Sequence, residues 1–212
     1  MPKIAVYVPT RGDVWHETAA ALGAALPTYV RCTTGVQDAR HMIVAEFLKS
    51  DADVCVMCDD DVIPPVGLWQ QVVNHVTVGR ADVCAAICPV ILEGTVFLPN
   101  VFVRDDSLEK GYKLSLQFIM NKGLHEVDAV GTGFIAIHRR VFEDKRMKDP
   151  FKADFIHGRG EDVQFCRRAK QARYKVFADF DVWCDHMVTV HANAIANSYM
   201  DVLNKGMGDA SE

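Results

Sequence analysis

Short runs with strand character recur along the first half of the chain and end at turn or breaker residues. They cover residues 3–8, 28–33, 53–58 and 82–90. Segments with apolar residues at helical spacing lie between them, at residues 15–26, 35–50 and 66–78. Because strands alternate with helices, this pattern predicts an α/β fold with a mostly parallel central sheet.

The second half of the chain carries weaker patterns. Residues 91–125 have scattered apolar positions and predict short strands or loops. A strand that leads through basic residues into a helix is expected over 127–142, and a helix opened by a glycine-rich turn over 158–172. Residues 174–180 alternate like a strand. The tail is expected to form a helix at about 190–205 and to fray beyond it.

The composition indicates a globular protein and argues against several other classes. The chain has 212 residues, 50% of them apolar and 24% charged, which suits one globular domain. The formal net charge of −5 argues against a nucleic-acid partner. No run approaches the roughly 18 apolar residues of a membrane span, and no signal-peptide pattern opens the chain. The seven cysteines are odd in number and lie mostly in apolar runs, so we expect buried free thiols and a cytoplasmic protein.

Three adjacent acids, Asp59, Asp60 and Asp61, follow the apolar run at 53–58 and are closed by two prolines. Since proline cannot continue a central strand, the acids are expected at the carboxyl end of the strand, where open α/β sheets place their ligands. Neighbouring carboxylates repel and need a cation, raised pKa values or full solvation. A metal site is therefore the favoured interpretation, and an exposed acidic turn is the alternative. No glycine-rich phosphate loop is present, which argues against dinucleotide and P-loop chemistry.

The segment Asp59-Asp60-Asp61-Val62-Ile63-Pro64 resembles the Asp-X-Asp motif of GT-A-fold glycosyltransferases, in a compact family-2-like form. The resemblance implies a three-layer α/β/α sandwich over residues 1–212. Its nucleotide-binding half would lie at about 1–90 and its acceptor-side half at about 91–190. It further implies Mn²⁺ or Mg²⁺ held against the diphosphate of a UDP- or GDP-sugar. Asp61 would bind the ion, Asp59 would contact the ion or the ribose, and Asp60 would belong to the donor site.

The turn after the first strand matches the place where this family holds the base and ribose of the donor. It consists of Pro9, Thr10 and Arg11. The alternative is structural, because Thr10 and Asp13 are suited to capping the first helix.

Two further stretches match donor-binding positions of the family. Ala39-Arg40-His41 corresponds to an Ala-Arg-Asn segment, and the arginine fork of donors suits a diphosphate or a base. A surface pair of Arg40 with Asp38 or Asp53 is the alternative. Gly131, Thr132 and Gly133 match a glycine segment at which the backbone approaches the donor. A plain turn or bulge before a buried strand is the alternative there.

The acceptor side shows two matches. Glu161 and Asp162 follow a glycine-rich turn and correspond to the family's acidic pair, although acids in a first helical turn also stabilise the helix dipole. His186, which comes soon after the strand that follows the acidic helix, matches the histidine that completes the metal site. His191 is the second choice.

The resemblance implies a glycosyltransferase of the hexosyltransferase type, with an unknown acceptor. Asp162, or Glu161, would act as the base of an inverting transfer, whereas in a retaining transfer the pair would orient the acceptor. Two alternatives stay open. One is a phosphatase of the haloacid-dehalogenase type that uses Asp59 and Asp61, and the other is a non-catalytic nucleotide or sugar binder.

Overall fold

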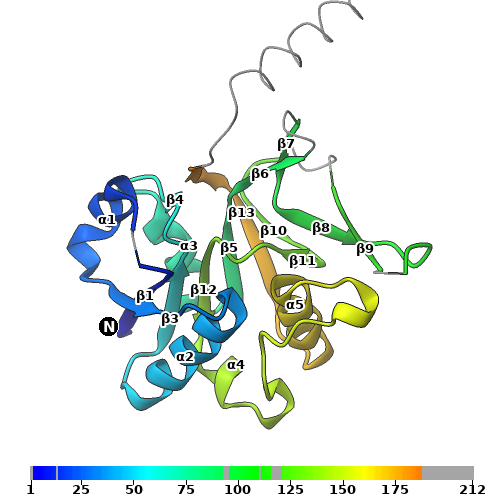
Figure 1. The fold of residues 1–212 in the computed structure, drawn as a ribbon, viewed down its shortest axis with the longest axis horizontal. Coiled ribbons are helices and arrows are strands. Elements are labelled where there is room, and N and C mark those ends of the chain that lie inside the picture. The colour runs from blue at the N-terminus through cyan, green and yellow to red at the C-terminus, as the bar shows by residue number, and fades with distance from the viewer. Residues whose placement is uncertain (1, 13, 93–95, 110, 116–120, 188–212) are drawn as a thin grey trace, which may run out of the picture.

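A seven-stranded sheet runs through the middle of the molecule, with the strand order β10-β13-β5-β12-β3-β1-β2. Figure 1 shows this computed structural model, which describes residues 2–12, 14–92, 96–109, 111–115 and 121–187. The sheet strands are β1 (Ile4–Thr10), β2 (Thr28–Arg31), β3 (Val54–Cys58), β5 (Val83–Ile87), β10 (Leu124–Glu126), β12 (Phe134–His138) and β13 (Val176–Trp183). Five of them run in one direction, while β12 and β10 are antiparallel to their neighbours. The mostly parallel sheet is therefore confirmed.

Helices cover both faces of this sheet. They are α1 (His16–Leu22), α2 (Val36–Lys49), α3 (Trp69–Thr77), α4 (Arg139–Glu143) and α5 (Glu161–Gln171), with 3₁₀ turns at Gly23–Ala25, Lys145–Met147 and Phe155–His157. The alternation along β3 separates two cores, since Cys55 and Met57 pack with residues of α2, α4 and α5. Val54, Val56 and Cys58 pack with α1 and α3. The predicted three-layer α/β/α sandwich is thus confirmed.

Short strands extend the carboxyl edge of the sheet. They are β4 (Val62–Ile63) with β14 (Asp185–His186), β6 (Pro89–Leu92) with β7 (Val96–Pro99), and β8 (Val101–Arg104) between β9 (Tyr112–Leu114) and β11 (Ala129–Val130). The run expected as one strand over 82–90 is split, because Pro89 has no N–H for the central ladder and instead begins β6.

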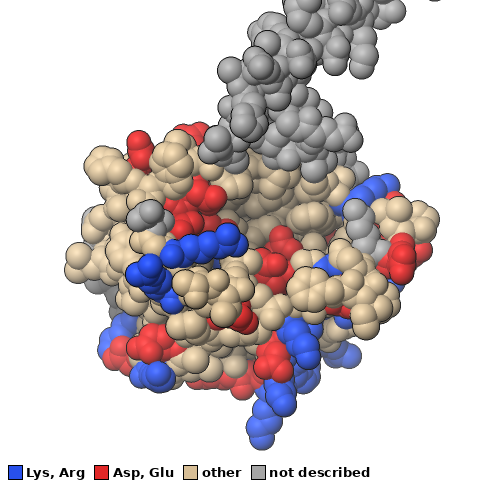
Figure 2. Space-filling view, in the orientation of Figure 1, with Lys and Arg blue, Asp and Glu red and all other residues tan. Residues whose placement is uncertain are grey.

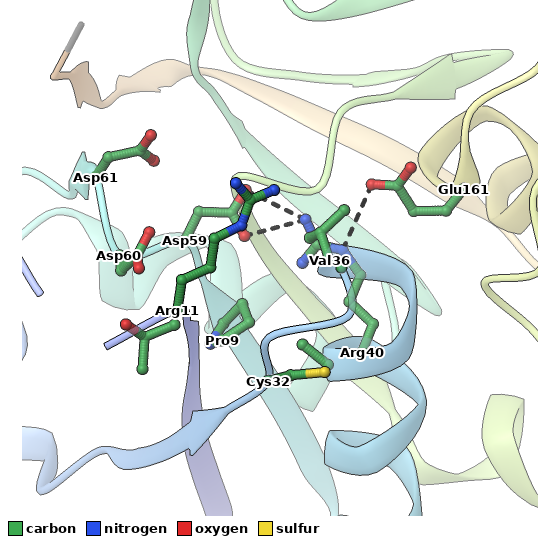
Figure 3. A pocket seen from close by; sticks show the side chains of 12 residues that line it. Pro9, Arg11, Cys32, Val36, Arg40, Asp59, Asp60, Asp61 and Glu161 are labelled. Atoms are coloured by element: carbon green, nitrogen blue, oxygen red, sulfur yellow. Dashed lines mark hydrogen bonds and ion pairs between the residues drawn. The ribbon is translucent and has the colours of Figure 1, made fainter. Parts of the chain in front are cut away.

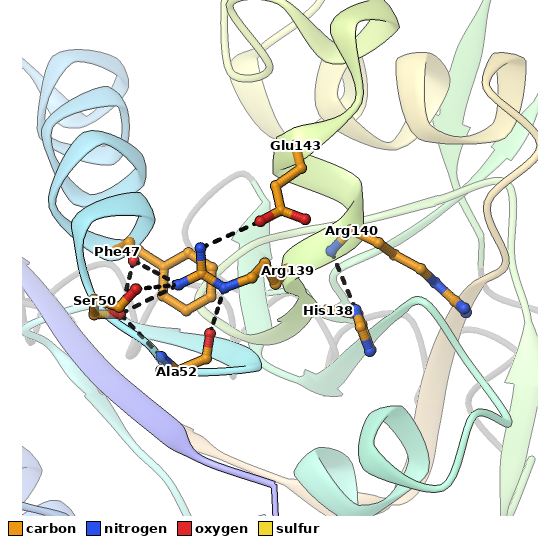
Figure 4. A network of polar contacts seen from close by, with 7 residues as sticks. All are labelled: Phe47, Ser50, Ala52, His138, Arg139, Arg140 and Glu143. Atoms are coloured by element: carbon orange, nitrogen blue, oxygen red, sulfur yellow. Dashed lines mark hydrogen bonds and ion pairs between the residues drawn. The ribbon is translucent and has the colours of Figure 1, made fainter.

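Arg139 joins the end of α2 to the start of α4, as Figure 4 shows. Its guanidinium donates to the carbonyl oxygens of Phe47, Ser50 and Ala52 at 3.1, 2.7 and 2.6 Å, and its Cζ lies 4.7 Å from the centre of the Phe47 ring. These bonds satisfy carbonyl groups that the end of a helix leaves unpaired. The same bonds hold α2 against the start of β3, the strand that ends at the three acids. Arg40 lies near the other end of α2.

Several boundaries differ from the sequence expectation. The first helix begins at His16, and its N-cap residue Trp15 makes no side-chain capping bond. The Thr10 hydroxyl accepts from the N–H of Gly12 at 3.0 Å, so Thr10 does not cap this helix, and Asp13 lies outside the described residues. The helix expected at about 190–205 and His191 also lie outside them. All seven cysteines are free and buried, as expected. Within the part of the chain that is described, no helix has the length and apolarity needed to cross a membrane.

Candidate functional site

A cavity of about 500 Å³ opens at the carboxyl edge of the sheet, where β1, β2 and β3 end. Figure 3 shows the side chains that line it, which are Pro9, Thr10, Arg11, Cys32, Gly35, Val36, Ala39, Arg40, Asp59, Asp60, Asp61 and Glu161. The carboxyl ends of parallel strands share one edge, so the turn after β1 and the acids after β3 meet here. In Figure 2, acidic side chains on this face gather in and around a hollow in the middle of the view.

Arg40 is the buried centre of this cavity. Its side chain is 2% exposed, and one terminal nitrogen donates to both carboxylate oxygens of Asp59, at 3.0 and 3.2 Å. Its Nε lies 3.8 Å from Glu161, and Figure 3 shows the two acids on opposite sides of the guanidinium. The alternative pairs with Asp38 or Asp53 are not formed. Nε and Nη1 are buried without a hydrogen-bond partner among the described residues, which leaves donors for an anionic ligand.

Burial and Arg40 have opposite effects on the pKa of Asp59. Burial raises the pKa of its carboxyl group to about 6, although Arg40 pulls it down, and the nearby Asp61 adds to the rise. Both of its oxygens accept hydrogen bonds from Arg40, so Asp59 orients Arg40 in the cavity. Metal binding by Asp59 together with Asp61 stays a prediction.

Asp61 and His186 meet at one edge of the cavity, although they are far apart in the sequence. The antiparallel pairing of β4 with β14 sets His186 opposite Val62, and the Asp61 carbonyl accepts from the N–H of Met187 at 2.8 Å. The His186 Nε2 atom lies 3.5 Å from Asp61 Oδ2. Hydrogen bonding to Asp61 raises the pKa of His186 to about 8.

The donor set of this pair fits a divalent ion. The Nδ1 atom of His186 is 2.9 Å from the carbonyl oxygen of Pro89, so it carries the proton in the neutral ring and leaves Nε2 as the free lone pair. Metal-binding histidines are oriented by bonds of this kind. No group of three or more His, Cys, Asp or Glu side chains within the described ranges is spaced to hold a metal ion by itself. Two protein ligands are nevertheless sufficient where substrate phosphates supply the others.

The two acids at the start of α5 point in different directions. Glu161 lines the cavity beside Arg40, whereas Asp162 is not among the lining side chains. The Asp162 carboxylate accepts from the N–H of Val163 at 2.6 Å, and a Cβ on Gly160 would lie 3.0 Å from its oxygen. Burial is the main cause that raises the pKa of Asp162, followed by the charge of Glu161. Burial therefore outweighs the helix N-terminus, which would lower that pKa.

The glycine segment has a structural explanation. A Cβ on Gly131 would lie 2.8 Å from the side-chain nitrogen of Asn100, and one on Gly133 would lie 3.0 Å from the Cys88 sulfur. Thr132 is 3% exposed. None of Gly131, Thr132 and Gly133 lines the cavity, so close packing accounts for the glycines and donor binding by this segment stays a prediction.

Four lining residues of the cavity were not predicted from the sequence. Cys32, Gly35, Val36 and Ala39 come from the turn after β2 and the start of α2. The signal was present, since β2 is parallel to β1 and must end at the same edge. Pro9, Thr10, Arg11 and Asp60 lie where they were expected, on the cavity wall.

Comparison with known proteins shows the fold. No family model matches the sequence, and no curated protein matches it. The crystal structure of A197 from STIV is 22% identical, with a TM-score of 0.62 over 88% of this chain and 86% of that chain. The structure of GalNAc-T7 with UDP, GalNAc and Mn²⁺ is 13% identical, with a TM-score of 0.62 over 90% of this chain and 45% of that chain. This chain thus spans less than half of the GalNAc-T7 chain, and at such identities the likeness concerns architecture alone: the chain has a GT-A-type α/β fold.

Proposed function

We propose that this protein is a metal-dependent glycosyltransferase that moves a sugar from a nucleoside diphosphate sugar to an acceptor hydroxyl group. The observation that carries the proposal is the pair of Asp61 and His186, which lies 3.5 Å apart beside a cavity lined by Arg11 and Arg40. A carboxylate, an oriented imidazole and two guanidinium groups suit a diphosphate with its cation. GalNAc-T7, which shares the fold, was crystallised with UDP and Mn²⁺, and this supports the same ligand classes here.

The residues divide into three roles in this proposal. Asp61 and His186 hold Mn²⁺ or Mg²⁺, and the chemistry that such an ion supplies is neutralisation of the charge on the leaving diphosphate. The Nε and Nη1 atoms of Arg40, which have no hydrogen-bond partner among the described residues, would donate to the same phosphates. The turn that contains Pro9, Thr10 and Arg11 forms the wall for the nucleoside, which the proposal takes to be that of a UDP- or GDP-sugar. A cytoplasmic site of action, inferred from the free thiols, belongs to the same proposal.

The acceptor is activated or oriented by Glu161 and Asp162. A raised pKa makes Asp162 a stronger base than an ordinary carboxylate, while Glu161 is the member of the pair that reaches the cavity. Asp162→Asn and Glu161→Gln keep the shapes and remove the basicity. If the transfer inverts the sugar, loss of the base should lower turnover by about 10²- to 10⁴-fold while donor binding survives. Normal turnover by both variants would leave the pair without a catalytic part.

Calorimetry of UDP and GDP with and without Mn²⁺ tests the proposal. We expect binding of one nucleotide that depends on the ion, and Asp61→Asn should remove that dependence. Asp185→Asn is the matched control, because Asp185 is an exposed acid next to His186 whose side chain leaves the opposite face of the strand. Failure of every nucleotide to bind with either ion would refute the proposal.

The two alternatives predict different results. A haloacid-dehalogenase type phosphatase needs Asp59 as a free nucleophile, yet both of its oxygens accept hydrogen bonds from Arg40. Hydrolysis of a phosphate ester that is lost in Asp59→Asn would favour that class. A non-catalytic binder would bind the nucleotide but would neither transfer nor hydrolyse the sugar of any donor.

A further inference from the structure

A second cavity, of about 400 Å³, lies between the β8–β9 hairpin and α5. Figure 1 shows this hairpin projecting beside α5, on the side of the molecule away from α1. The cavity is lined by Arg104, Asp106, Gly111, Tyr112, Asp128, Arg159, Arg167, Lys170 and Gln171. It has no lining residue in common with the donor cavity, so its chemistry is separate from the acids after β3.

The lining of this second cavity is basic in an acidic protein. Four lining side chains are cationic and two are carboxylates, whereas the whole chain carries a formal charge of −5. The two carboxylates belong to Asp106, which pairs with Arg104 at the exposed rim, and Asp128, which lies 3.8 Å from Lys170. Two acids outside the lining, Asp154 and Glu126, pair with Arg159 and Lys170, so most of the positive charge of the lining is offset by carboxylates close to it.

Arg167 is the cation that this cavity leaves without a counter-ion. Its guanidinium donates only a long hydrogen bond of 3.5 Å, to the side-chain oxygen of Gln164. Within the described part of the chain no carboxylate lies within 4.0 Å of it. Tyr112 lies close enough for the Arg167 charge to act on its phenol, although burial dominates and raises the pKa of Tyr112, which keeps the hydroxyl protonated as a donor. A half-buried, unpaired arginine beside a phenol is a ready anion receptor.

Two other cations of the cavity are held in place by the protein. Arg159 pairs with Asp154 at 3.2 Å and donates to the carbonyl oxygen of Glu109 at 3.4 Å. Lys170 donates to the carbonyl oxygen of Val127 at 2.9 Å and pairs with Glu126 at 3.1 Å. The carboxylates offset these two charges, and the bonds to backbone carbonyls fix both side chains at the cavity wall before a ligand arrives.

We propose that this cavity is a second anion-binding site, which takes the phosphate group of a phosphorylated small molecule. The forked donors of Arg167 and Arg159 match the several oxygens of a phosphate, and Lys170 adds a point charge. A phosphate group has more oxygens than a carboxylate, so it can contact Arg167, Arg159 and Lys170 at the same time. The site does not depend on the function proposed for the donor cavity.

The test is isothermal titration calorimetry with inorganic phosphate, glucose 6-phosphate, glucuronate and glucose, in EDTA so that the ion site is not engaged. Glucose 6-phosphate and phosphate should bind, glucuronate should bind at least tenfold more weakly, and glucose should give no signal. Arg167→Gln should weaken phosphate binding by about 10- to 100-fold, the effect of losing a hydrogen bond to a charged group. Arg104→Gln, at the exposed rim, gives a second measurement in case the first variant is poorly folded.

Arg80→Gln is the matched control, since Arg80 is an exposed arginine beyond the end of α3 with no ion pair among the described residues. An equal loss in this control would show non-specific charge attraction and overturn the proposal. Absence of phosphate binding to the wild type would overturn it as well, and equal affinity for glucuronate would overturn the choice of phosphate. Binding of UDP with Mn²⁺ is measured in parallel, so the two sites can fail independently.

Discussion

Replacing Arg40 by methionine removes the guanidinium that pairs with Asp59 and keeps an apolar stem in its place. Arg40 is 2% exposed and donates to both oxygens of an acid that is itself 26% exposed. The variant therefore leaves a largely buried carboxylate without its partner, which is the costly way to break a buried ion pair. Asp59 can escape this cost by taking up a proton, so the loss of stability should depend on pH.

The size of the effect follows from the pKa of Asp59. Its value of about 6 in the folded protein exceeds the roughly 3.9 of an unfolded chain, so stability falls as the pH rises between these values. Arg40 is the main group that lowers this pKa, and without it we expect a further rise of about one to two pKa units. Each unit corresponds to about 1.4 kcal/mol. Because Asp59 in the variant is not fully ionised at pH 8, Arg40→Met should lose about 1.3 to 2.3 kcal/mol more at pH 8 than at pH 5. This is about 3 to 9 °C in Tm for a chain of this size.

Thermal unfolding from pH 5 to pH 8 in EDTA measures this difference. The double variant Arg40→Met with Asp59→Asn is the critical control, because it lacks the Asp59 carboxylate and should lose most of the pH-dependent part of the deficit. Arg80→Met removes an exposed arginine and should show no such dependence. A Tm deficit of Arg40→Met that is the same at pH 5 and pH 8, or one that Asp59→Asn leaves unchanged, would refute the reasoning.

Three further predictions concern the ion and the packing. Because the pKa of His186 is raised to about 8 beside Asp61, protons compete with Mn²⁺, and the affinity for Mn²⁺ should fall by about tenfold per pH unit below 8; a flat profile in calorimetry would exclude His186 as a ligand. Gly131→Ala should lower stability by about 1 to 3 kcal/mol in a denaturant titration, since its Cβ would lie 2.8 Å from Asn100. Gly23→Ala, whose Cβ meets nothing within 4 Å, should be neutral or stabilise by up to about 1 kcal/mol, and a large loss there would contradict the packing argument.

The sequence predicted the parallel core well because local patterns determine it. The apolar run of β3 is buried at every position, and the acids that follow it were placed correctly at the carboxyl edge. The direction of β12 within the sheet could not be predicted from its residue pattern. Its run of five buried or half-buried residues resembles β3 in pattern, yet it pairs antiparallel to both β3 and β5. Direction depends on the connections between strands, which residue patterns do not encode.

Contacts between side chains that are far apart in the sequence were predicted least well. The pattern around Arg40 suggested a helix start and allowed a nearby acid such as Asp38 as the partner, but the arginine is buried and reaches Asp59 and Glu161. A buried arginine takes whichever carboxylate the fold brings to it, and that choice is made by tertiary packing. The same reason explains why the contact of Asp59 with Arg40 was not predicted from the sequence.

The acidic pair shows how far adjacent residues can differ in role. Successive side chains on a helix point about 100° apart, so only one of two neighbours can face a given cavity. In α5 that residue is Glu161, which pairs with Arg40, and Arg40 in turn pairs with Asp59. The Asp162 carboxylate instead accepts from the N–H of Val163, and a Cβ at position 160 would lie 3.0 Å from its oxygen. A base at Asp162 therefore has only its other oxygen without this bond, and that side chain does not line the cavity, whereas Glu161 can contact an acceptor from its present position.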